Sequence, residues 1–159
     1  MHSAVQPLAS ILSLNQRLLL NCLDGMSEEQ ARQRSGDSNS AAFLAVHLVD
    51  ARIHLLNGLG TEMPHPFGDR LRDVTRIDEM AWYPSLDQVR AAWNDVSVRL
   101  DARLAQLTAD DLSKESPAQF PIGDRTLLGM IAFLTQHDSY HVGQVSLLRR
   151  AAGLDPMKY

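Results

Sequence analysis

Apolar side chains recur at helical spacing along four long stretches of this chain, and no stretch alternates as a half-buried strand would. An amphipathic helix needs a partner that covers its apolar stripe, and helices of this length can cover one another. The pattern therefore predicts an all-α four-helix bundle formed by one domain, residues 1–159. The four stretches run from about 5 to 23, from 39 or 40 to 58, from 85 through 104, and from about 124 to just before 153.

Local signals mark where several helices begin and end. Ser27 and Ser85 each begin a capping box, and Thr108 repeats the same helix-start signal before a short turn. Gly58 suits the left-handed residue that closes the second helix. The connection from Leu59 to Pro84 has no periodic pattern, and such long connections are often functional. We expect it to gate access to a site, and we expect long crossover loops rather than the simplest up-down order.

Charge and apolar content exclude several classes of protein. The net charge of −4, without any cluster of Lys and Arg, argues against a nucleic-acid partner. No apolar run approaches the ~20 residues of a membrane span, and no secretion signal is evident, so we expect a cytoplasmic protein without a membrane partner. Cys22 is the only cysteine and is interpreted as a small core residue rather than a nucleophile.

The fourth stretch carries the strongest chemical signal. His137 and His141 are four residues apart, so both imidazoles project from one face of a helix. His47 lies among apolar residues on the second helix, where an inward polar ring needs a partner. If the three rings meet, they would bind one transition-metal ion and leave a position open for water or substrate. Alternatively, His47 is a core histidine bonded to a backbone carbonyl, and the helical pair is partly exposed.

Two segments resemble the DinB superfamily, a group of bacterial helical-bundle proteins related to thiol-dependent transferases. The run His137-Asp138-Ser139-Tyr140-His141-Val142-Gly143-Gln144-Val145 resembles the last helix of that family, and the run from Ser40 to Leu48 resembles its second helix. The resemblance implies an antiparallel four-helix bundle of unusual connectivity. It also implies that His47, His137 and His141 form a metal triad. The family name records an association with DNA damage and implies no DNA-binding chemistry.

Several neighbours of the triad have two interpretations each. His54 is either a further ligand or, as we favour, a structural or surface residue near a helix end. Asp50 either bonds the free ring nitrogen of a ligand or is a solvated carboxylate. Tyr140 is expected to pack in the bundle. Trp82 either lines the open side of the site or anchors its loop.

The resemblance favours a metal-dependent enzyme. We expect zinc or nickel to activate a thiol or water, with a low-molecular-weight thiol such as bacillithiol or mycothiol as a candidate cofactor and an unknown small-molecule substrate. The alternatives are a non-catalytic metal- or ligand-binding stress protein, and an adaptor-like bundle whose three histidines point apart. Gly143, Ala91 and Ala92 permit close helix approach, so we also expect a homodimer.

Overall fold

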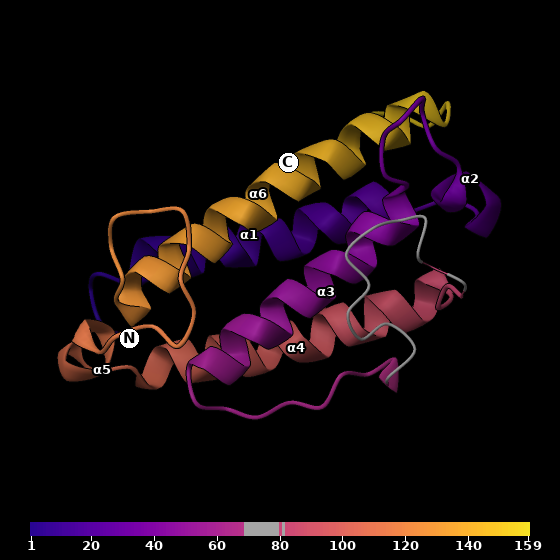
Figure 1. Cartoon of the computed structure of the whole chain (residues 1–159). Helices are drawn as coiled ribbons and strands as arrows, with labels where there is room; N and C mark the ends of the chain where they lie inside the picture. Colours follow the sequence, from indigo (N-terminus) through magenta and orange to yellow (C-terminus); the bar gives the residue numbers. More distant parts are fainter. Residues whose placement is uncertain (69–79, 81) are drawn as a thin grey trace.

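Helices dominate the computed structural model, which describes residues 1–68, 80 and 82–159 (Figure 1). The only β-type pairing in this described part is an isolated antiparallel bridge between Glu115 and Thr126. The helices are α1 (Gln6–Leu23), α2 (Glu28–Arg32), α3 (Ala41–Gly58), α4 (Leu86–Gln106), α5 (Ala109–Ser113) and α6 (Leu127–Ala151).

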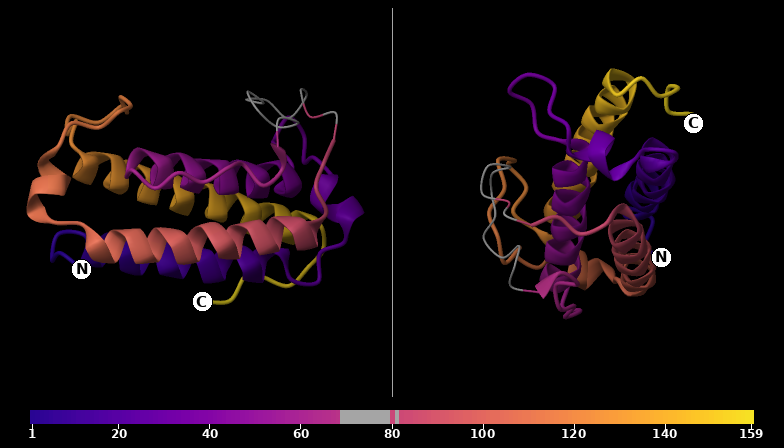
Figure 2. Two further views of the ribbon diagram at one scale, coloured as in Figure 1. Left: turned by 90° about the horizontal axis from the view of Figure 1, so that it is seen from below. Right: turned by 90° about the vertical axis from the view of Figure 1, so that its right-hand side faces the viewer.

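The long helices α1, α3, α4 and α6 lie side by side as a bundle (Figures 1 and 2). Helix α6 packs against α1 and α3, and α4 packs against the same two helices from the other side. Helices α1 and α6 run in one direction, and α3 and α4 run in the opposite direction (Figure 1). Consecutive long helices α1 and α3 are therefore diagonal rather than adjacent. This arrangement agrees with the predicted all-α bundle with a long crossover loop, which here joins two parallel neighbours, α3 and α4.

The predicted start signals form where the sequence places them. Ser27, Ser85 and Thr108 each make both bonds of a capping box, and Ser40 caps α3. Helix α6 begins later than residue 124, because Asp124 accepts hydrogen bonds from the backbone N–H and the hydroxyl of Thr126. Thr126 is then the residue that caps α6.

The end of α3 differs from the prediction. Gly58 remains in the helix, and Gly60 instead adopts the left-handed backbone, with φ of 82°. A side-chain carbon added at Gly58 would lie 2.9 Å from the Met130 sulfur of α6. The glycine at position 58 therefore permits close packing of α3 on α6 rather than a turn.

Helix α3 is the most enclosed of the long helices, with 13 of its 18 residues buried. It packs against both α4 and α6, and apolar side chains from all four long helices form one continuous core. His47 lies on the part of α3 that faces α6, so its ring meets side chains of that helix. None of the helices in the described ranges has the length and apolar character needed to cross a membrane.

Candidate metal centre

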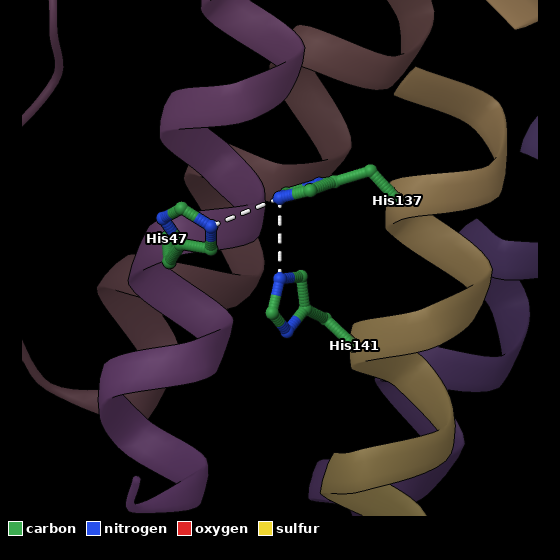
Figure 3. Close-up of side chains that lie close together, drawn as sticks. All are labelled: His47, His137 and His141. Carbon is green, nitrogen blue, oxygen red and sulfur yellow. Dashed lines mark hydrogen bonds between the residues drawn. The ribbon is translucent and has the colours of Figure 1, made fainter. Parts of the chain in front are cut away.

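Three imidazole rings meet between α3 and α6 (Figure 3). His47 projects from α3, while His137 and His141 project from α6 one turn apart. The His137 Nε2 atom lies 3.1 Å from His47 Nε2 and 3.1 Å from His141 Nε2. One nitrogen from each ring lies within 4.8 Å of the others. The structure thus brings together all three residues singled out in the sequence and excludes the adaptor model in which they point apart.

This geometry suits a single metal ion better than a set of hydrogen bonds. Zn–N bonds of about 2.0–2.1 Å in a tetrahedral site place two ligand nitrogens roughly 3.3 Å apart. In a hydrogen-bonded triad, by contrast, His137 Nε2 would face two nitrogens at 3.1 Å with only one proton to donate. A cation at the centre would satisfy all three lone pairs at once.

The charge state of the rings also suits metal binding. Burial, and to a smaller extent the neighbouring His141 and His47, lower the pKa of His137 to about 4. Burial likewise lowers the pKa of His47 and of His141. All three rings are consequently neutral near pH 7, which is the form that binds metals.

Gln144 orients one of the three rings. The His141 Nδ1–H donates to Gln144 Oε1 at 2.6 Å, which leaves the Nε2 lone pair of the same ring facing the centre. Outer-shell bonds of this kind commonly fix the orientation of metal-binding histidines. Gln144 is a residue of the site that no sequence pattern singles out, although its position three residues after His141 on a helix places the two side chains within reach.

Aromatic side chains lie next to each of the three imidazoles and shield them in part from water. Phe43 is stacked on His47 with ring centroids 6.2 Å apart, and the Phe133 ring is 6.4 Å from that of His137. The Tyr140 ring stands edge-on to His141 at 5.0 Å. Tyr140 itself is exposed, so the expectation that it packs inside the bundle is wrong. It projects from the outer face of α6.

His54 and Asp50 lie outside the three-histidine cluster. His54 is exposed, and its ring contacts Phe120 edge-on at 6.2 Å. Asp50 is 62% exposed, and its carboxylate lies 3.7 Å from His65 Nε2. Its charge nevertheless raises the pKa of His47 somewhat against the larger effect of burial. The structural interpretation of His54 and the solvated interpretation of Asp50 are the ones that these contacts support.

Trp82 belongs to the connection expected to act as a gate. Its ring lies 6.4 Å from that of Phe67, and its side chain packs against the core. These contacts support an anchoring role for Trp82. The gating prediction itself falls partly on residues 69–79 and 81, which lie outside the described residues.

A buried charged network fixes α6 next to the triad. Arg52 Nε donates to Asp138 Oδ2 at 2.8 Å, its Nη1 donates to Ser97 at 2.5 Å, and its Nη2 donates to the Leu12 carbonyl at 2.7 Å. The guanidinium also stacks over the Trp93 ring at 3.7 Å. Arg52 therefore bonds one group on each of the other long helices. Asp138 directly follows His137 in α6, so this network helps to fix the position of the His137 side chain.

Cys22 is a core residue, in line with the interpretation of the sequence. Its side chain is buried, and burial raises the pKa of the thiol to about 11. Near pH 7 the thiol is protonated and inaccessible, so it is a poor nucleophile and a poor metal ligand. Chemistry at the triad must therefore rely on groups other than this cysteine.

Comparison with known proteins agrees with this fold. The model of the DinB superfamily matches residues 11–145. Among solved structures, a DinB-like protein from Bacillus subtilis aligns over 99% of this chain and 97% of its own, with a TM-score of 0.64 and 14% identity. At that identity the likeness shows the fold alone. No curated protein matches the chain.

Proposed function

The chain belongs to the DinB superfamily, and on this basis we propose that it is a metal-dependent enzyme in which His47, His137 and His141 hold one divalent ion. The observation that carries the proposal is the approach of three Nε2 atoms from neutral imidazoles toward one centre. Imidazole ligands suit zinc and nickel, which are the ions we propose. We further propose that residues 1–159 act as one domain.

Three protein ligands leave at least one position free for a reacting group. A bound divalent ion would lower the pKa of a coordinated thiol or water and so supply an anionic nucleophile near neutral pH. Gln144 would hold His141 in its ligating orientation, and Phe43 and Phe133 would limit the access of water. The reaction type we propose is thiol-dependent transfer or hydrolysis. Because Cys22 is buried, the thiol in such a transfer would come from a small molecule.

One observation supports a second candidate, a protein that binds metal or a small ligand without turnover. The cluster that could hold a metal contains only histidines among the described residues. Asp50, whose charge acts on His47, is mostly exposed and faces His65. The described part of the site thus presents no carboxylate that is placed as a general base.

Metal titration of chelator-treated protein tests the triad. We expect one equivalent of zinc to bind. Separate His47→Ala, His137→Ala and His141→Ala variants should each weaken binding by more than about a hundredfold, since losing even an outer-shell partner costs roughly 10–100-fold. His54→Ala is the matched control and should bind zinc normally, because His54 lies on α3 outside the cluster. Stoichiometric zinc binding by a variant lacking all three histidines would refute the site.

An activity screen separates the two candidates. Metal-loaded protein is assayed with low-molecular-weight thiols against electrophiles, and with hydrolysable esters and amides, using metal-free protein as the control. Turnover that requires both metal and the triad supports the enzyme. Tight zinc binding without turnover favours the binding protein. Activity that survives chelation and loss of the triad would contradict a metal-based mechanism.

A further inference from the structure

A cavity of about 350 Å³ lies along the α3–α6 interface that carries the triad. Its size falls within the roughly 300–1,000 Å³ typical of small-molecule sites. The segment between α2 and α3 forms one wall, and the C-terminal half of α6 forms another. The lining residues are Ser35, Asp37, Ser38, Asn39, Leu44, Gln144, Leu147, Leu148 and Ala151.

Two of these residues connect the cavity to the metal centre. Gln144 lines the cavity and also bonds the Nδ1 of His141. Leu44 lines it from α3, one helical turn before His47. The cavity therefore neighbours the metal centre through Gln144 and Leu44, and none of the three imidazoles lines it.

The lining has an apolar side and a polar rim. Leucines and Ala151 form the apolar side, and Leu147 is 68% exposed, a large side chain that a bound apolar group would cover. The rim holds two hydroxyls, two amides and the carboxylate of Asp37, which is the only formally charged side chain in the lining. Arg34 braces this wall from outside the lining by donating to the backbone carbonyls of Asp37 and Ser38.

We propose that this cavity binds a small apolar amine beside the metal centre. The apolar body would lie on Leu44 and Leu148, and the ammonium group would face Asp37. An anionic molecule of the same size would bind less well, because it would meet the carboxylate instead. The position beside a metal centre rests on the function proposed above, whereas the binding of an amine does not require the metal.

Amide chemical shifts of the isotope-labelled full chain test the proposal, with benzylamine as the probe and benzoate as its anionic counterpart. Benzylamine should shift the amides of residues 35–39 and 144–151 in metal-free and zinc-loaded protein alike. It should bind about threefold to fivefold more tightly than benzoate, the ratio expected for a partly exposed ion pair worth up to ~1 kcal/mol. Asp37→Asn should remove that preference.

A matched pair of variants tests the location. Ala151→Trp fills the cavity from the end of α6 and should abolish benzylamine binding. Val98→Trp adds the same side chain at an exposed position on α4 and should leave binding unchanged. Both variants should still bind zinc.

Shifts centred elsewhere, equal affinity for benzoate, or unchanged binding in Ala151→Trp would each overturn the proposal. Failure of zinc binding with intact amine binding would instead refute the metal centre and leave the amine site standing.

Discussion

Arg52 on α3 bonds groups on all three other long helices. Its guanidinium is buried, and its ion pair with Asp138 joins α3 to α6 directly beside His137. Burial raises the pKa of the Asp138 carboxyl to about 6, although Arg52 acts to lower it. Because pH 7 lies above this pKa, the Asp138 carboxylate is charged, as is the Arg52 guanidinium. Both side chains are buried away from water, so each charge is stabilised by the other.

Replacing Arg52 by Met should lower the free energy of unfolding by about 3–5 kcal/mol, because it leaves the Asp138 charge buried without its partner. The double variant Arg52→Met/Asp138→Asn should recover part of this loss, since it removes the unpaired charge. Urea unfolding followed by circular dichroism measures both. Arg99→Met is the control: Arg99 pairs with Asp95 on the exposed face of α4, so its loss should stay below about 1 kcal/mol. Equal losses for Arg52→Met and Arg99→Met would show that the buried network contributes little.

Helix α6 carries His137 and His141, and it also contains Gly143, a glycine that the packing of the chain does not require. Beyond the local backbone of α6, a side-chain carbon at Gly143 would meet no atom of the described residues within 4 Å, so close packing of the bundle helices does not explain this glycine. Gly58 at the end of α3 is the opposite case, because it faces the Met130 sulfur of α6. Identical substitutions at these two glycines should therefore differ in their effect on stability.

At protein concentrations low enough to keep the chain monomeric, Gly143→Ala should raise the free energy of unfolding by about 0.5–1 kcal/mol, the difference in helix propensity between the two residues. Gly58→Ala should raise it by less than Gly143→Ala does, because the flexible end of the Met130 side chain must move aside for the added methyl group. Thermal and urea unfolding of the two variants, compared at equal protein concentration, measure both changes. A destabilising Gly143→Ala would mean that the position contacts something beyond its own chain, or that α6 is distorted there.

The described residues leave the outer face of α6 around Tyr140 and Gly143 uncovered, and we propose that the protein forms a homodimer through this face. Tyr140 is exposed there, and Gly143 offers a flat surface for a second helix. Ala92, in contrast, is buried within its own bundle and so does not contribute to such an interface.

Light scattering at micromolar concentration should give twice the chain mass of 17.7 kDa. Gly143→Arg should give the monomer mass while leaving the helical content unchanged, because the added side chain has free space in its own chain. Val98→Arg, on the exposed face of α4, should remain dimeric. A monomeric parent protein would refute the homodimer, and a dimeric Gly143→Arg variant would place the interface elsewhere.

Much of this structure follows from local rules that a single sequence contains. Apolar periodicity located α1, α3, α4 and α6, and the capping boxes located the starts of the shorter helices, because these features depend on residues three or four positions apart. The pair formed by His137 and His141 is local in the same sense. The approach of His47 to this pair was expected as one of two alternatives, with the family resemblance favouring it.

Other features depend on the packing of all the long helices at once. His47 and His137 are 90 residues apart, and Arg52 and Asp138 are 86 apart, so both contacts form only when α3 and α6 lie at one particular rotation and offset. Helical periodicity indicates which face is buried but not which helix covers it. The diagonal placement of α1 and α3, the role of Gly58 and the cavity beside Gln144 therefore come from the packed bundle, where steric fit among distant segments selects one arrangement.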